Sequence, residues 1–186
     1  MIARNGVMSV SRRYMVGVAV LVLAACNATA PNTGDGFRDP GALIGATSRF
    51  DEKRFVGEWH VRAAFPGDQD LSKIALVRLS TGNPAFRLVK RTCKVNNTCK
   101  DSGEIWRARM LGQGRYALDG PEGGPGRQLW VLWVDEGFRT AVVGTPSGHY
   151  GWILDRSTTG GADRIKAARE LLDFNGYDVS QLQVRK

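Results

Sequence analysis

Alternation of apolar and polar side chains constrains this chain more than any other feature. Within residues 58–65 the odd positions are apolar and the even ones mostly polar, and the apolar set is Trp59, Val61, Ala63 and Phe65. A period of two is typical of a strand with one buried face. Seven further strands are predicted at 73–80, 85–92, 103–111, 114–119, 127–135, 138–145 and 149–156.

Turn residues bound these runs, among them Thr81-Gly82-Asn83-Pro84, Pro146-Ser147-Gly148 and the stretch from Gly120 to Gly126. Eight short strands at hairpin spacing predict an all-β fold, an eight-stranded up-and-down antiparallel β-barrel, because closure leaves no open sheet edge. One C-terminal α-helix should follow from near Asp163 to Asn175-Gly176 and pack outside the barrel. Its apolar stripe is Ile165, Ala168 and Leu172, and Arg164 is expected to face water. A short extended piece is expected within 178–184.

The N-terminus has the three parts of an export signal. Arg4, Arg12 and Arg13 precede an apolar run, residues 15–25, that is too short to span a bilayer. The run ends in Leu23-Ala24-Ala25-Cys26, which resembles a bacterial lipobox. The resemblance implies that residues 1–25 are a lipoprotein signal peptide and that Cys26 is diacylated and N-acylated, which gives a stable membrane anchor. An ordinary cleavable signal with an incidental cysteine is the alternative.

Composition predicts two further regions. Residues 26–48 are rich in Asn, Thr, Gly, Pro and Ala and should form a flexible tether, and residues 49–186 should form one barrel domain. The chain has 26 basic and 18 acidic residues, of which three basic ones lie in the signal, so the mature chain has a net charge of +5. These charges are scattered along the strands, which favours a solvated outer face and not a nucleic-acid interface. Modest attraction to anionic lipid remains open.

Two cysteines remain if Cys26 is lipidated. Cys93 and Cys99 flank five residues that include Asn96 and Asn97, which tight turns tolerate. An exported chain matures under oxidising conditions, so a disulfide between them is expected. A redox or zinc pair is the weaker alternative, because the spacing is not C-x-x-C.

Four motifs in order resemble the lipocalin family, in the form found in bacterial outer-membrane lipoproteins. Phe50-Asp51-x-x-x-Phe55-x-Gly57-x-Trp59 resembles the opening motif, and the stretch from Trp130 to Val143 resembles the middle one. Trp152-Ile153-Leu154-Asp155-Arg156 resembles the third, and Gly176 to Leu182 resembles a segment after the helix. The middle motif departs from the wider family at Glu136-Gly137-Phe138.

The resemblance implies a calyx with Gly57, Trp59 and Arg156 as structural residues, Arg156 stacked on Trp59 at the closed end. It also implies a hydrophobic ligand and an outer-membrane location on the periplasmic face. Inward-facing aromatic residues are the ligand-binding candidates, and they either line a pocket or fill the core. Parity along the strands predicts five of them: Phe65, Trp106, Trp133, Tyr150 and Trp152.

Enzymatic interpretations find little support. The two histidines, His60 and His149, are expected at the surface. No Ser-His-Asp pattern or metal-ligand spacing is present, so neither a cofactor nor a metal is predicted. Gly123-Gly124-Pro125-Gly126 lacks the Lys-Ser/Thr of a phosphate-binding loop.

The sequence therefore predicts a lipid-anchored lipocalin that holds a lipid or other small hydrophobic molecule, a fatty acid or lysophospholipid for example, without catalysis. One alternative is a periplasmic barrel that acts through its rim on a protein, such as a protease inhibitor. Another is a structural envelope protein with a filled barrel. Transport versus storage and the oligomeric state stay open.

Overall fold

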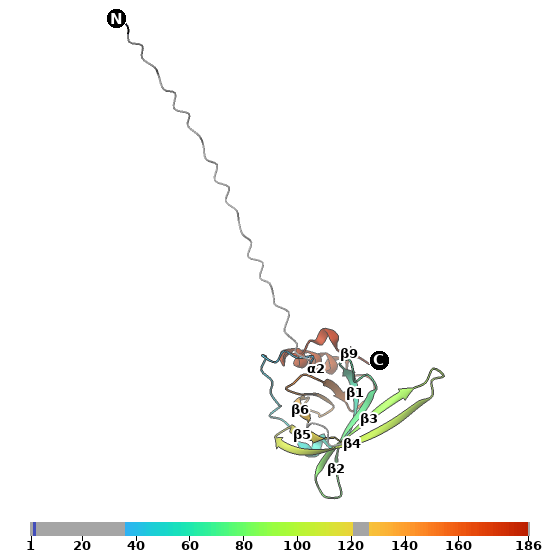
Figure 1. Ribbon diagram of the computed structural model, residues 1–186. Coiled ribbons are helices and arrows are strands. Elements are labelled where there is room, and N and C mark those ends of the chain that lie inside the picture. The colour runs from blue at the N-terminus through green and yellow to red at the C-terminus, as the bar shows by residue number, and fades with distance from the viewer. Residues whose placement is uncertain (1, 3–35, 121–126, 186) are drawn as a thin grey trace. The chain divides into compact units, whose positions relative to one another are not determined.

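A computed structural model of the chain describes residues 2, 36–120 and 127–185 (Figure 1). The predicted signal peptide, Cys26 and the predicted turn at 121–126 lie outside the described residues. The strands are β1 (Gly57–Ala64), β2 (Leu71–Arg78), β3 (Pro84–Cys93), β4 (Cys99–Gly112), β5 (Arg115–Asp119), β6 (Arg127–Val134), β7 (Thr140–Gly144), β8 (Gly151–Asp155) and β9 (Gln183–Val184).

Antiparallel pairing of neighbouring strands closes the barrel. The order is β2-β3-β4-β5-β6-β7-β8-β1-β9, and β1 also pairs with β2, so β1–β8 form a ring and β9 is an extra strand on β1. The predicted eight-stranded antiparallel barrel is therefore confirmed. Helices are α1 (Glu52–Phe55), α2 (Ala162–Phe174) and the short 3-10 helix η1 (Val179–Gln181). Over the described residues, none of these helices has the length and apolar character needed to cross a membrane.

Helix α2 packs on the outside of the barrel, as predicted. Its buried side chains are Ile165, Ala168 and Leu172, which join a helix-side cluster with Ala63, Leu132, Val142, Ile153 and Tyr177. Arg164 was expected in water, but its Nη2 donates to Asp155 Oδ2 at 3.2 Å and its Nε to Thr140 Oγ1 at 2.8 Å. Asp155 is almost fully buried. A buried carboxylate needs a charged partner, and Arg164 supplies it across the helix–sheet contact.

Two β-bulges set which side chains face the interior. The register between β1 and β8 shifts at Val61/Ala63, and that between β6 and β7 shifts at Val131/Trp133. Each shift adds one residue to one strand, which reverses the inward parity beyond it. Ala64 and Val134 consequently face the interior, although alternation predicted the opposite side for both.

The closed end is built around Trp59 and Arg156, as the sequence resemblance implied. Trp59 is fully buried, and its Nε1 donates to Phe55 O at 2.9 Å. The Arg156 guanidinium lies 3.7 Å from the centroid of the Trp59 ring. It also donates to four backbone carbonyls, those of Arg54, Phe55, Val56 and Glu58. Helix α1 and the start of β1 are thereby fixed across this end.

Residues 36–48 differ from the predicted tether, because they lie along the barrel. Phe37 stacks on Phe65 with ring centroids 4.8 Å apart, and Phe65 stacks in turn on Tyr177 at 5.5 Å. Arg38 is buried, and its Nε donates to Asn175 O at 2.8 Å. Thr47 N donates to Val131 O at 2.9 Å. The low hydrophobicity of residues 36–48 gave no sign of these contacts in the sequence, because the side chains of Phe37 and Arg38 make many of them.

Tyr177 connects the C-terminal segment to the loop between β7 and β8. Its hydroxyl accepts from Thr145 N at 2.8 Å and donates to the carbonyls of Thr145 and Tyr150, each at 3.0 Å. Gly144 makes this approach possible, because a Cβ there would lie 2.3 Å from the Tyr177 hydroxyl. Burial raises the pKa of Tyr177 to about 12, so the hydroxyl keeps its proton as a donor.

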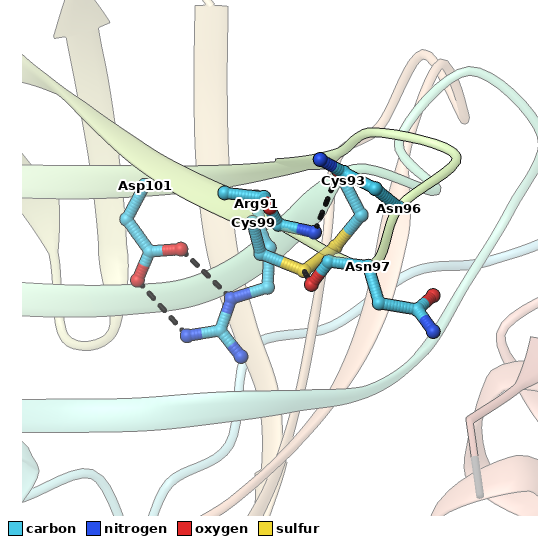
Figure 2. Close-up of a disulfide and its surroundings, with 7 residues drawn as sticks. Arg91, Cys93, Asn96, Asn97, Cys99 and Asp101 are labelled. Carbon is cyan, nitrogen blue, oxygen red and sulfur yellow. Dashed lines mark hydrogen bonds and ion pairs between the residues drawn. A yellow bond between two sulfur atoms is a disulfide. The ribbon is translucent and has the colours of Figure 1, made fainter.

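The β3–β4 hairpin extends beyond its neighbours as a two-stranded ribbon (Figure 1). Among described residues, β2 pairs with β3 only to Lys90, and β5 pairs with β4 only from Arg107. Figure 2 shows the predicted Cys93–Cys99 disulfide near its tip. Asn97 has a φ of +61° in the turn, a conformation that asparagine tolerates.

We expect Arg156→Lys to lower the free energy of unfolding by roughly 1–3 kcal/mol, because lysine keeps the charge but loses most of the donors to the four backbone carbonyls. Urea unfolding followed by tryptophan fluorescence measures this. Arg109→Lys, at an exposed position of β4, is the control and should change little. Equal effects of the two variants would contradict the role given to Arg156.

We expect Tyr177→Phe to cost about 1–3 kcal/mol of stability, because Thr145 N loses its acceptor in a buried position. Hydrogen exchange of the Thr145 amide should also accelerate more than that of the α2 amides. An unchanged exchange rate would show that the Tyr177 hydroxyl does not fix this loop.

Candidate ligand site at the barrel mouth

Loops at the end opposite Trp59 surround a pocket of about 720 Å³, called here the mouth pocket. Three segments line it: the β1–β2 loop, the start of β6 and the β7–β8 loop. The lining residues are Pro66, Gly67, Asp68, Arg127, Gln128, Thr145, Pro146, Ser147, His149 and Tyr150. Helix α1 and Arg156 cover the other end, where a hollow of similar volume, about 720 Å³, lies between Glu52, the β2–β3 loop and β4.

Two stacked aromatic rings lie next to the pocket. Tyr150 and Trp152 have ring centroids 4.6 Å apart with an interplanar angle of 16°, and both are buried. The Tyr150 hydroxyl donates to the Gln128 carbonyl. Burial raises the pKa of Tyr150 far above its ordinary value, so the phenol stays neutral. Tyr150 lines the pocket with an apolar ring and a polar edge, and Trp152 stacks behind it.

Asp68 gives the pocket a carboxyl group. Trp152 Nε1 donates to Asp68 Oδ2 at 2.9 Å. Burial raises the pKa of Asp68, although the Trp152 hydrogen bond and the positive charges of Lys90 and Arg127 act in the opposite direction. The loop that holds Asp68 is fixed by its own turn, in which Asp68 N donates to Phe65 O at 3.3 Å.

Arg127 supplies the opposite charge at the start of β6. Its guanidinium lies 5.0 Å from the centroid of the Trp106 ring. Trp106 is half-buried and packs against the interior cluster, and its Nε1 donates to Glu104 Oε2 at 3.3 Å. A cation over an aromatic face is attracted by the ring quadrupole, which holds Arg127 near the rim.

The predicted ligand residues separate into two groups. Trp106, Tyr150 and Trp152 belong to or pack on the interior cluster, at the mouth side. Phe65 and Trp133 instead join the helix-side cluster, which corrects the parity prediction. The bulges in β1 and β6 are the reason. Each inserts one residue before Ala63 or Trp133, so the side chains that follow lie on the opposite face of the sheet from the one that alternation predicts. Phe65 therefore stacks between Phe37 and Tyr177, outside the barrel.

Sequence reasoning missed the polar lining of the pocket. Asp68, Arg127 and Gln128 lie in or beside loops and show no periodic pattern that separates them from ordinary surface residues. His149 is exposed, as predicted, and still lines the rim. A glycine-flanked aspartate after a buried phenylalanine was the one local signal, and it is common in turns.

The interior below the mouth is occupied by side chains. The interior cluster, beyond the residues already named, includes Phe50, Phe55, Val61, Leu71, Ile74, Leu76, Phe86, Tyr116, Leu118, Leu129, Val131, Phe138, Val143 and Leu154. A molecule that binds here therefore contacts the mouth first and enters deeper only if these side chains move. In the part of the chain that the structure describes, no group of three His, Cys, Asp or Glu side chains could hold a metal ion.

Comparison with known proteins bears on this geometry. Residues 124–186 match the model of the lipocalin-like domain family. Over 53 residues the chain is 38% identical to temperature-induced lipocalin-1 of Arabidopsis thaliana, a stretch that covers 28% of each protein. These matches support the lipocalin family.

Two solved structures share the fold. Lobster apocrustacyanin A1 and apocrustacyanin C1 each superpose with a TM-score of 0.52 at 12% identity, over 72% of this chain and 78% of theirs. At that identity the likeness concerns the barrel and its topology alone. The lipocalin resemblance stated from the motifs thus agrees with the fold and with the C-terminal third of the sequence.

Asp68→Asn should alter how stability depends on pH. The raised pKa means that the folded state binds more protons than the unfolded state between pH 3.8, the unfolded value, and the folded pKa. The stability of the wild type minus that of the variant should therefore fall as pH rises through this interval. Asparagine retains an acceptor for Trp152. Urea unfolding of both proteins from pH 3 to neutral pH measures the difference, and a rise with pH would contradict the burial of Asp68.

Proposed function

We propose that this chain is a lipocalin-type binding protein that holds a lipid or other small hydrophobic molecule at the mouth pocket, without catalysis. The stacked Tyr150–Trp152 pair beside a hollow of about 720 Å³ carries the proposal. That volume lies in the range of small-molecule sites, about 300–1,000 Å³. The apolar wall of the mouth pocket consists of Tyr150, Pro66 and Pro146, and most of the other lining residues are polar.

The polar rim indicates an amphipathic occupant, such as a fatty acid or lysophospholipid. Its acyl chain would contact Tyr150, Trp152 and Trp106, and each buried CH₂ would contribute about 0.8 kcal/mol. Its head group would lie near Arg127, whose guanidinium can form bidentate hydrogen bonds with a carboxylate or phosphate. Asp68 lies on the same rim, where burial raises the pKa of its carboxyl and Trp152 Nε1 donates to it.

We further propose that the protein is anchored through lipidated Cys26 to the periplasmic face of a bacterial outer membrane. The support is the sequence Leu23-Ala24-Ala25-Cys26 behind a basic segment, together with Asn27 in place of an inner-membrane retention Asp. An anchored barrel would take up or release its ligand close to the bilayer. The source of the ligand would decide whether this uptake and release serves transport or storage.

Tryptophan variants test the proposed position of the ligand. In the full chain, Trp106→Phe and Trp152→Phe should each remove a large part of the fluorescence change on titration with lysophosphatidylcholine. Trp133→Phe is the matched control, because that ring packs in the helix-side cluster, and it should leave the change intact. The apparent affinity should fall severalfold for Trp152→Phe, whose indole both stacks on Tyr150 and donates to Asp68.

Two results would contradict the proposal. Loss of the signal in Trp133→Phe alone would place the ligand under α2, outside the barrel. Absence of any change with lysophosphatidylcholine and with palmitate would remove the lipid hypothesis and favour a protein partner at the rim.

A further inference from the structure

Another pocket lies on the outer surface of the barrel, and four of its eleven lining residues are arginine or lysine. We call it the basic pocket; its volume is about 660 Å³. Its lining residues are His60, Val61, Arg62, Gln69, Asp70, Ser72, Lys73, Arg91, Cys93, Thr158 and Arg185. His60 pairs with Lys73 across β1 and β2, next to Trp59 and Ile74, which face the interior. Alternation therefore places His60 and Lys73 on the outside, away from the mouth pocket.

Two of the four basic side chains already have carboxylate partners. Lys73 Nζ lies 2.9 Å from Glu58 Oε1. Arg91 forms two hydrogen bonds with Asp101 across the hairpin, at 2.7 and 3.0 Å, as Figure 2 shows. The positive charges of Lys73 and Arg91 are therefore largely balanced by these carboxylates.

Arg62 and Arg185 differ from that pair. Within residues 36–120 and 127–185, neither forms an ion pair with a carboxylate. Arg62 Nη1 donates to the carbonyls of Ser157 and Gly160, and Arg185 Nη2 donates to those of Asp68 and Gln69. The two residues are adjacent in space, because Arg185 N donates to Arg62 O at 2.8 Å. Each guanidinium thus has donors left for another acceptor.

Arg62 and Arg185 are both partly buried. Arg62 Nε is buried and has no hydrogen-bond partner among the described residues. Burial also lowers the pKa of Arg185, although the negative charges of Asp70 and Asp68 act in the opposite direction. An anion nearby would offset this effect of burial, because a partly buried charge is stabilised by an opposite one. Asp70, the carboxylate within the pocket, has its Oδ2 4.0 Å from Lys90 Nζ and also attracts Arg185 without forming an ion pair with it.

We propose that the basic pocket is a binding site for a phosphoryl group, held by Arg62 and Arg185 with Lys73 and His60 beside them. A phosphate presents several oxygens and up to two negative charges, which suits donors arriving from β1, from β2 and from the residue after β9 better than a planar carboxylate does. Arginine pairs with phosphate through two parallel hydrogen bonds, and lysine adds a point charge. The phosphoryl group belongs either to a phospholipid head group or to a soluble phosphate ester.

The test uses the full chain and three kinds of probe. Inorganic phosphate and glycerol 1-phosphate are titrated separately and followed by amide shifts of ¹⁵N-labelled protein. Vesicles of phosphatidylcholine, with and without phosphatidylglycerol, are tested by co-sedimentation. The N-terminal segment is the same in every arm, so the difference between the two vesicle compositions reports the anionic head group.

Arg185→Gln should weaken phosphate binding about tenfold or more, because it removes charge-assisted hydrogen bonds to the anion. Lys73→Gln, which leaves both guanidinium groups in place, should weaken it severalfold. Arg49→Gln changes the net charge equally at an exposed position outside the pocket and is the matched control. Circular dichroism verifies that each variant is folded.

The outcomes separate the sources and can overturn the site. Binding of both soluble probes, without a phosphatidylglycerol effect, supports the site with a soluble ester as its ligand. A phosphatidylglycerol effect that Arg185→Gln abolishes and Arg49→Gln does not supports it with a lipid head group. Equal losses of phosphate binding in Arg185→Gln and Arg49→Gln would mean that net charge alone attracts the anion, and would overturn the site. Absence of amide shifts at Arg62 and Arg185 with millimolar phosphate, together with no vesicle effect, would overturn it as well. Arg185 also donates to the carbonyl of Asp68 at the mouth, so the Lys73→Gln result, which leaves that contact in place, is the one that does not depend on occupancy of the mouth.

Discussion

Contact between Arg156 and Trp59 determines what the two ends of this barrel can do. One guanidinium lies 3.7 Å from the indole centroid and caps the carbonyls around α1, so that end is filled by backbone and aromatic rings. A barrel of eight strands has room inside for side chains or one small ligand. With that end covered and the interior packed, the loops at the opposite end surround a surface hollow, the mouth pocket.

The bulges in β1 and β6 determine which aromatic residues reach that surface. They direct Phe65 and Trp133 outward, where Phe65 stacks between Phe37 and Tyr177. Tyr177 in turn holds the β7–β8 loop through Thr145, and this loop carries Tyr150. The outer packing therefore supports the mouth indirectly, since a chain of contacts runs from the N-terminal segment to the Tyr150–Trp152 pair.

Alternation and turn residues were sufficient to predict the barrel, its helix and the disulfide, because each depends on short-range patterns that a sequence displays directly. Ile165, Ala168 and Leu172 are an example, since their spacing alone identifies the buried stripe. The site was predicted less well. An inserted residue in a β-bulge leaves no mark in composition, so Trp133 was assigned to the wrong face. Asp68 and Arg127 meet only through tertiary structure, and Arg38 is buried despite a polar neighbourhood. Cys26 and the proposed anchor stay predictions from sequence.

The most direct test of a ligand at the mouth is to identify what the protein carries from the cell. The full chain would be produced with its own N-terminus, purified under mild conditions and analysed by native mass spectrometry, with Trp152→Ala as the comparison. The account predicts a bound lipid near one equivalent in the native protein and much less in the variant. Equal amounts in both proteins, or none in either, would contradict a ligand site built on Tyr150 and Trp152.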